Sequence, residues 1–217
     1  MKTHMQSNGI LIVIEGIDGS GKTTLMYNLA AKLTAARHAV CTTKEPGDTQ
    51  LGKQLRALLQ EKPIPVTAKA EYLLFAADRA QHIEEVIKPA LMRGDIVLCD
   101  RMGDSSVIYQ GYGRGLSISM IKTINAWALD DITPALTFYV RIPHAIAFAR
   151  LKARGKLSSF EQEAENFTSK LIDGFETLYA SRTDVVTLDG TLSPEDIANQ
   201  AYASLEPLMA HTTVSHT

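Results

Sequence analysis

Residues Gly16-Ile17-Asp18-Gly19-Ser20-Gly21-Lys22-Thr23 have the spacing G-x-x-x-x-G-K-T of a phosphate-binding loop. The apolar run 10–14 before them predicts a buried strand, and the apolar spacing over 24–33 after them predicts a helix. A strand before and a helix after are the context in which this loop binds phosphate. The sequence therefore predicts a nucleoside-triphosphate site near the start of this 217-residue chain.

Each residue type in this loop has a chemical role toward a triphosphate. Glycines let backbone N–H groups approach the phosphate oxygens, and the helix N-terminus adds partial positive charge. We expect Lys22 to reach the β- and γ-phosphates and the Thr23 hydroxyl to ligate Mg²⁺. The residues predicted to bind the ATP phosphates are Gly16, Gly19, Ser20, Gly21, Lys22, Thr23 and Thr24.

The composition is that of an ordinary globular protein. Hydrophobic residues make up 45% of the chain, charged residues 21%, and the formal net charge is −2, so we do not expect a nucleic-acid polymer as partner. No apolar run approaches the roughly 20 residues that span a membrane, and the polar N-terminus lacks a signal-peptide core. Cys41 and Cys99 lie in apolar, strand-like runs, so we expect core thiols in a reducing compartment.

Strand and helix signals alternate along the chain. Further strands are predicted at 39–43, 96–100, 135–142 and 185–188, and further helices at 49–59, 67–91, 118–129, 145–154, 160–179 and 194–208. Trp127 is expected in the core. This order predicts an α/β fold of the P-loop NTPase type, with a five-stranded parallel sheet, helices on both faces and the site at the carboxyl ends of the strands.

The strand predicted at 96–100 ends in Asp100, which is followed by Arg101. A carboxylate at this position can hold the water shell of Mg²⁺. The planar fork of an arginine suits a phosphate, which favours transfer to a phosphorylated acceptor over hydrolysis. Residues 100–103 also spell the D-x-x-G of GTPases, but no N-K-x-D motif accompanies them, since 43–46 lack the final Asp. We treat that match as coincidence.

Four further stretches occur in a fixed order with the phosphate loop. They are Glu45-Pro46-Gly47-Asp48-Thr49 with Arg56, Leu74-Phe75-Ala76-Ala77-Asp78-Arg79, Asp100-Arg101 with Ser105-Ser106, and Tyr109-Gln110-Gly111. Together they resemble the bacterial thymidylate kinases with an arginine-rich lid, over about residues 10–188. The resemblance implies transfer of the ATP γ-phosphoryl group to dTMP with Mg²⁺, giving dTDP, in a cytoplasmic homodimer.

The resemblance also implies roles for individual residues. Phe75 is expected to stack on thymine, Arg79 to donate to a thymine carbonyl, and Tyr109 to exclude a ribose 2′-hydroxyl. The implied catalytic residues are Lys22, Arg101, Arg154 and Asp18, and the implied metal ligands are Thr23, Asp100 and Glu45. The implied dTMP-binding residues are Asp18, Glu45, Arg56, Phe75, Arg79, Arg101, Ser105, Ser106, Tyr109 and Gln110.

Segment 141–159 has five basic residues and no acidic one. The resemblance implies a lid there, at about 150–160, with Arg150 and Arg154 facing ATP. We expect one kinase domain over 1–217, with flexible tails at 1–9 and 210–217. The resemblance implies that the loop 189–194 lies beside adenine. Asp48, Arg141 and Ser158-Ser159 depart from the family pattern, so lid closure and ATP contacts stay open.

Two alternative functions remain compatible with the sequence. One is a related kinase that acts on another pyrimidine deoxynucleotide, such as dUMP. The other is an ATP-binding module that has kept the fold without turnover.

Overall fold

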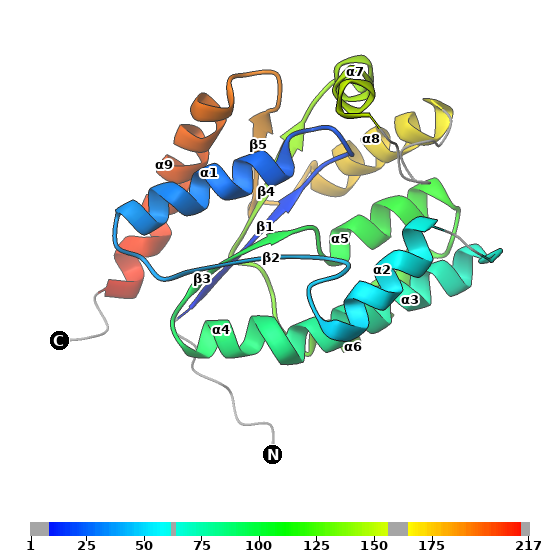
Figure 1. The fold of residues 1–217 in the computed structure, drawn as a ribbon, viewed down its shortest axis with the longest axis horizontal. Helices are drawn as coiled ribbons and strands as arrows, with labels where there is room; N and C mark the ends of the chain where they lie inside the picture. The colour runs from blue at the N-terminus through cyan, green and yellow to red at the C-terminus, as the bar shows by residue number, and fades with distance from the viewer. Residues whose placement is uncertain (1–8, 62–63, 156–164, 214–217) are drawn as a thin grey trace.

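The computed structural model describes residues 9–61, 64–155 and 165–213 (Figure 1). A five-stranded parallel sheet with strand order β2-β3-β1-β4-β5 forms its centre. The strands are β1 (Ile10–Glu15), β2 (Val40–Lys44), β3 (Ile96–Asp100), β4 (Leu136–Arg141) and β5 (Val185–Asp189). Because β1 lies in the middle, the phosphate loop leaves the sheet at its centre, between the ends of β3 and β4.

Helical segments connect the strands and cover both faces of the sheet (Figure 1). They are α1 (Lys22–Ala35), α2 (Gln50–Glu61), α3 (Ala68–His82), π-helical η1 (Ile83–Ile87), α4 (Lys88–Met92), α5 (Gly103–Ser106), π-helical η2 (Val107–Gly113), α6 (Ile118–Leu129), α7 (His144–Arg154), α8 (Glu165–Tyr179) and α9 (Pro194–Thr213). The predicted α/β class and five-stranded parallel sheet are confirmed.

The alternation of side chains along the strands divides the core into two faces. Ile12 and Ile14 of β1 point to the face covered by α1 and α9, where Leu29 and Leu205 pack against them. Leu11 and Val13 point to the opposite face and pack against η1, α4 and the alternate side chains of β3. Because both faces of β1 are buried, its residues are apolar without alternation, and this continuous apolar run is the signal that predicts the strand.

The sequence interpretation is wrong about Trp127. Its side chain is 85% exposed, because α6 buries the stripe Ile121, Asn125 and Ala128 instead. The buried stripe contains a polar residue, Asn125, so hydrophobicity alone selects the wrong face of this helix.

Two segment predictions need correction, and one helical segment is missing from the sequence analysis. The helix predicted over 67–91 is divided into α3, η1 and α4, with a π-helical turn at Ile83–Ile87. No helix was predicted over 103–113, where α5 and η2 lie; Gly103, Gly111 and Gly113 weaken the helical signal there. The last helix continues to Thr213, past residue 208 and into the predicted tail.

Cys99 is buried and Cys41 half-buried, and both are free thiols. Of the helices in the described ranges, none has the length and apolar character needed to cross a membrane.

Candidate active site

The phosphate loop has a backbone that only glycine adopts without strain at several positions. Gly16, Gly19 and Gly21 have φ values of +147°, +81° and +103°. A Cβ at Gly19 would lie 2.5 Å from the carbonyl oxygen of Ala147 on α7. The loop therefore packs closely against α7 at Ala147, and its glycines leave the backbone N–H groups at the N-terminus of α1 accessible to a ligand.

Polar side chains of this loop face a cavity. The Lys22 Nζ donates to the Ile17 carbonyl at 2.9 Å, and burial, followed by the nearby Arg101, lowers the pKa of Lys22. Ser20 Oγ is buried and has no hydrogen-bond partner within the described ranges. An ammonium and an unpaired hydroxyl at a helix N-terminus suit the oxygens of a polyphosphate.

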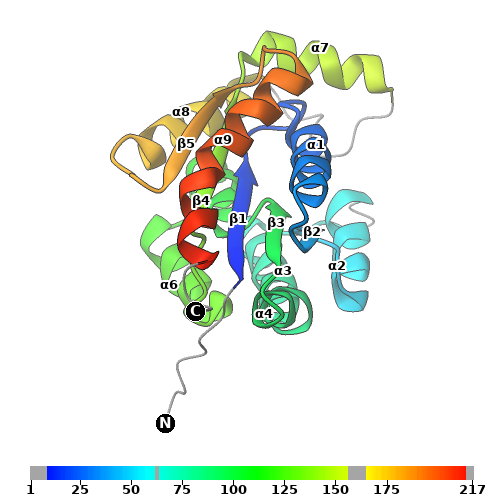
Figure 2. The ribbon, with the colours of Figure 1, turned by 90° about the vertical axis from the view of Figure 1, so that its left-hand side faces the viewer.

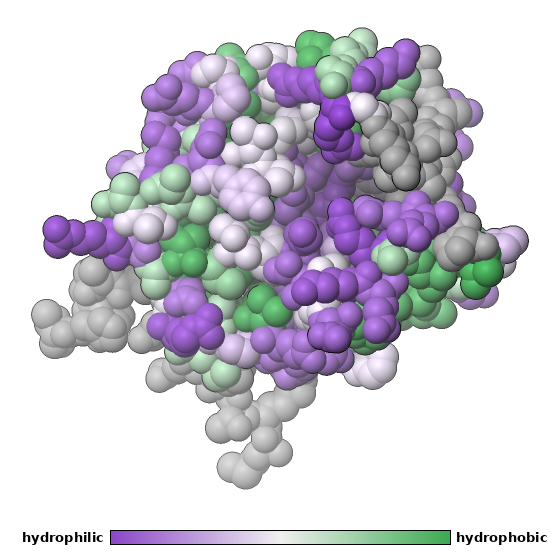
Figure 3. Space-filling model, in the orientation of Figure 1, coloured by the Kyte–Doolittle hydropathy of each residue, from purple (hydrophilic) through white to green (hydrophobic). Residues whose placement is uncertain are grey.

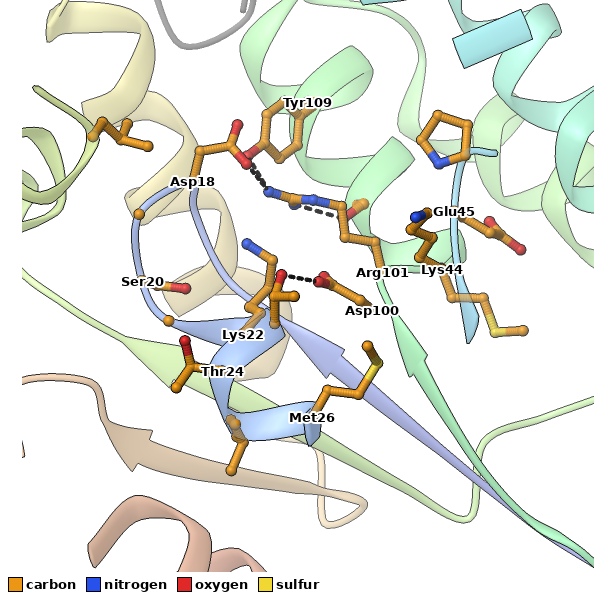
Figure 4. Close-up of a pocket in the computed structure, with 18 of the residues that line it drawn as sticks. Asp18, Ser20, Lys22, Thr24, Met26, Lys44, Glu45, Asp100, Arg101 and Tyr109 are labelled. Atoms are coloured by element: carbon orange, nitrogen blue, oxygen red, sulfur yellow. Dashed lines mark hydrogen bonds and ion pairs between the residues drawn. The ribbon is translucent and has the colours of Figure 1, made fainter. Parts of the chain in front are cut away.

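The ends of β1 and β3 bring two oxygen ligands together. Ile14 pairs with Asp100 across the two strands, and the Thr23 Oγ1 donates to Asp100 Oδ2 at 2.7 Å (Figure 4). A hydroxyl and a carboxylate beside a phosphate site fit Mg²⁺, which prefers oxygen ligands and completes its shell with water and substrate phosphates. The residues present therefore fit the predicted metal.

Glu45, the third predicted metal ligand, lies apart from this pair. Its Oε2 accepts from Arg79 Nε at 2.9 Å, and its Oε1 lies 3.1 Å from His82 Nδ1. Figure 4 shows Glu45 on the far side of Asp100 from the phosphate loop. Both carboxylate oxygens are engaged, so coordination of a metal by Glu45 remains a prediction that would require this network to open.

A second anion-binding group faces the phosphate loop. The Arg101 Nη2 donates to Asp18 Oδ1 at 2.6 Å and to the Tyr109 hydroxyl at 3.0 Å, while Nη1 donates to Ser105 Oγ at 3.1 Å. Partial burial raises the pKa of Asp18, but Arg101 and Lys22 outweigh it and hold that pKa below its usual range. Asp18 thus keeps its charge and aims the guanidinium into the cavity.

Glu15 supports the turn that carries Arg101, and the sequence analysis missed it. Arg101 has a φ of +73°, which is unusual for a residue with a side chain. The Oε1 of Glu15 accepts from the backbone N–H groups of Met102 and Ser105 at 2.9 and 3.2 Å, and Oε2 accepts from Ser105 Oγ at 2.6 Å. Ser105 therefore links Glu15 to Arg101. The sequence does contain a signal for this role, because Glu15 is an acidic residue that directly follows the apolar run 10–14 and precedes the phosphate loop.

Arg79 lies at the centre of a buried network. Its Nη2 donates to Ser106 Oγ at 3.0 Å and to the Met102 carbonyl at 3.2 Å, and its Nη1 donates to Asn125 Oδ1 at 2.8 Å. The Asn125 side chain in turn donates to the Gly103 carbonyl at 2.8 Å. Four of the five N–H groups of Arg79 are engaged once Glu45 is counted, so the structure holds Arg79 rigidly beside Phe75 and Ser106.

Two more predicted dTMP-binding residues are fixed by neighbours. Arg56 on α2 donates from Nη1 to the Pro46 carbonyl at 2.8 Å. The ring of Tyr109 lies beneath the Arg101 guanidinium, 4.9 Å from its centroid. Burial raises the pKa of Tyr109, against the lowering effect of Arg101, so its hydroxyl stays protonated near neutral pH.

The predicted lid begins in α7, next to the phosphate loop. Figure 2 shows α7 above the end of β1 and the start of α1. The Nη1 of Arg150 lies 3.4 Å from the Ser20 carbonyl, and Arg154 lines the same cavity. The remainder of the lid prediction, 156–160, lies outside the described residues.

One cavity of about 1520 Å³ joins these groups. It is visible in Figure 3 as a hollow of hydrophilic residues between α7 and α2. Every predicted site residue except Gly16 lines it, as do Gly190 and Leu192 of the predicted adenine loop. Pockets for one ligand usually measure about 300–1,000 Å³, so this cavity has room for two.

Comparisons with known proteins agree with this geometry. A family model described as Thymidylate kinase matches residues 14–201. The chain belongs to the thymidylate kinase family. The thymidylate kinase of Halothermothrix orenii is 42% identical over 199 residues, which cover 89% of this chain and 95% of the relative. The one from Deinococcus radiodurans is 38% identical over 200 residues, 92% and 97% of the two chains, and that from a Synechococcus strain is 40% identical over 205 residues, 94% and 98%.

Thymidylate kinases are phosphotransferases that convert dTMP to dTDP with ATP, so the family assigned from the sequence motifs is confirmed. Two departures from the family pattern now have structural partners. Asp48 accepts from Thr43 Oγ1 at 2.6 Å, and Arg141 donates to Glu176 of α8 at 2.7 Å. Ser158 and Ser159 lie outside the described residues.

Proposed function

We propose that this chain transfers the γ-phosphoryl group of ATP to the 5′-phosphate of dTMP in the cavity described above, with Mg²⁺. The observation that carries this proposal is that two anion-binding groups face one another in a single cavity. Lys22 and the N-terminus of α1 form one, and the Arg101–Asp18 pair forms the other. A water-activating hydrolase needs only the first of these.

Catalysis in this arrangement consists of positioning and charge neutralisation. Lys22 binds the β- and γ-phosphates, and Thr23 with Asp100 holds Mg²⁺, which when bound neutralises charge on the triphosphate. Arg101 and Arg56 orient the acceptor phosphate so that its oxygen lies in line with the bond that breaks. No side chain forms a covalent intermediate. Arg150 and Arg154 add positive charge from α7 as the γ-phosphoryl group moves.

The acceptor site is assigned to the walls around Phe75. Phe75 stacks on thymine, Arg79 and Ser106 bind the base edge at one end, and Gln110 binds it at the other. Tyr109 lies where a ribose 2′-hydroxyl would collide, and Asp18 with Ser105 supports the sugar and phosphate end. Glu45 acts here through its ion pair with Arg79.

The test is product formation by the purified chain with Mg-ATP and a panel of monophosphates. We expect fast formation of dTDP from dTMP, slower reaction with dUMP, and little with dCMP or with the ribose form of TMP. A preference for dUMP would retain the phosphoryl chemistry and overturn the base-site assignment. Absence of turnover with every acceptor, together with no rise in melting temperature on adding dTMP, would identify a non-catalytic ATP-binding module.

We further propose that two copies of the chain pair through α3 and α6. On α6, Met120 and Trp127 lie seven positions apart on one face, and they are 59% and 85% exposed. The adjoining α3, which packs on α6 through Tyr72, carries Leu73 with 49% of its surface exposed. An aromatic anchor beside other apolar side chains is a typical centre of a protein interface.

Sedimentation equilibrium tests the dimer. We expect the wild type to sediment as a dimer and Trp127→Glu as a monomer. Met92 on α4, 58% exposed and outside the proposed surface, provides the matched control, because Met92→Glu adds the same charge elsewhere and should stay dimeric. A Trp127→Glu variant that remains dimeric would rule out this surface.

The proposed compartment is the cytoplasm. The two free thiols, Cys41 and Cys99, suit a reducing environment. Cell fractionation with an antibody against the chain checks this assignment, and recovery outside the cytoplasmic fraction would contradict it.

A further inference from the structure

Two hydrogen bonds between helices bracket Phe75. Glu71, Phe75 and Arg79 lie at successive turns of α3 and share one face. Across from them, Ser106 ends α5 and Gln110 lies one turn later in η2. Ser106 accepts from Arg79 at one end, at 3.0 Å, and the Gln110 Nε2 donates to Glu71 Oε1 at the other, at 2.9 Å.

The contact with Glu71 determines which end of the Gln110 amide faces the cavity. A carboxylate only accepts hydrogen bonds, so the NH₂ group of Gln110 must face it. Both side chains are buried, and the Nε of Arg114 lies 3.4 Å from the same Glu71 oxygen. In the part of the chain that the structure describes, no group donates to Gln110 Oε1, and Gln110 lines the cavity. The amide oxygen is therefore the atom left for a ligand.

We propose that Glu71 determines base specificity by holding the Gln110 amide so that its oxygen, not its nitrogen, meets the acceptor base. Thymine and uracil carry an N3–H that donates to such an oxygen. Cytosine carries a lone pair at N3, which the oxygen repels. The inference rests on the proposed dTMP site and assigns to Glu71, which does not itself touch the base, the rejection of cytosine nucleotides.

A purely structural role for Glu71 is the competing explanation, since the same bond also ties η2 to α3. Two substitutions separate the explanations. Glu71→Gln keeps the size of the side chain but offers either an oxygen or a nitrogen, so the Gln110 amide can turn over. Glu71→Asp disturbs packing more, but it still only accepts and should keep the amide in its orientation.

The experiment compares kcat/KM for dTMP, dUMP and dCMP in these variants. For Glu71→Gln we expect the ratio of dTMP to dCMP to fall by about tenfold, the scale set by one buried hydrogen bond. The ratio of dTMP to dUMP should not change, because both bases carry N3–H. Glu71→Asp should keep the wild-type preference against dCMP.

Matched controls make each outcome decisive. Arg114→Met removes a second neighbour of Glu71 and should leave the dTMP to dCMP ratio unchanged. If Glu71→Gln lowers kcat/KM equally for all three acceptors, Glu71 only ties the helices and the inference is overturned. If that variant does not fold, Gln110→Met must reduce the ratio instead, and an unchanged ratio also overturns it. Failure of the wild type to phosphorylate dTMP would count against the proposed function itself.

Discussion

The buried carboxyl of Glu15 should make the stability of this protein fall as pH rises through neutrality. Burial raises its pKa from 4.5 to about 7, Asp104 adds to the rise, and Arg101 and the hydrogen bonds from Ser105 and Met102 oppose it. Lys22, Tyr109 and Tyr179 are further titratable groups that interact with the charge of Glu15. Between pH 4.5, the ordinary pKa of this carboxyl, and about pH 7, its pKa in the folded chain, the folded protein holds a proton at Glu15 that the unfolded chain has lost.

The size of this effect follows from linkage. Because the unfolded state binds fewer protons there, the free energy of unfolding decreases with pH, by about 1.4 kcal/mol for each pH unit. From about pH 5.5 to about pH 8 the titration of Glu15 removes about 2 kcal/mol, since the loss stops once the folded group ionises near 7. Glu15→Gln cannot titrate and lacks this contribution.

The assay is urea unfolding of wild type and Glu15→Gln at these two pH values. Other groups, including Asp78 with a pKa raised to about 6 by burial and by Glu45, titrate equally in both proteins and cancel in the double difference. We expect the wild type to lose about 2 kcal/mol more than the variant. An equal loss in both proteins would show that Glu15 is already ionised at the lower pH and would refute the reasoning.

Three further predictions concern catalysis. Arg101→Lys keeps the charge but loses the planar guanidinium that binds Asp18 and a phosphate. In steady-state assays we expect kcat/KM for dTMP to fall about 100-fold and KM for ATP to stay nearly unchanged. An equal rise in KM for both substrates would contradict the assignment. Tyr109→Phe keeps the ring, so this variant should still prefer dTMP to the ribose form of TMP, as competition assays can check. Loss of this preference would show that the hydroxyl, not the ring, excludes ribose. Thr23→Ala should raise the Mg²⁺ concentration that half-maximal activity needs, and an unchanged Mg²⁺ titration would remove Thr23 from the metal site.

The parts of the fold predicted from sequence are those with a strong local signal. The loop 16–23 and strand 10–14 are recognisable because glycine positions and a buried strand impose a local pattern. Asp100 and Arg101 were placed opposite this loop because parallel strands end at the same edge of a sheet. The prediction for Trp127 is wrong because α6 buries Asn125 instead. Asn125 is buried because it accepts a hydrogen bond from Arg79 on another helix, which the local sequence does not reveal.

The residues that sequence reasoning missed act through partners distant in the chain. Glu71 meets Gln110, and Glu15 meets Ser105, only after the helices and strands have packed. No spacing rule links such pairs, because their contact depends on how α3, η2 and β1 lie in space. The roles of Glu45 and Arg79 were likewise predicted separately, whereas the structure joins them in one buried ion pair.

The most direct test of the account follows the γ-phosphoryl group itself. Purified protein is incubated with Mg²⁺, dTMP and ATP labelled in the γ-phosphate, and the products are separated by chromatography. The account predicts that the label appears in dTDP, with little released as inorganic phosphate. Label in inorganic phosphate with dTMP unchanged would contradict it, because Arg101 and Asp18 would then not present an acceptor to the phosphate loop.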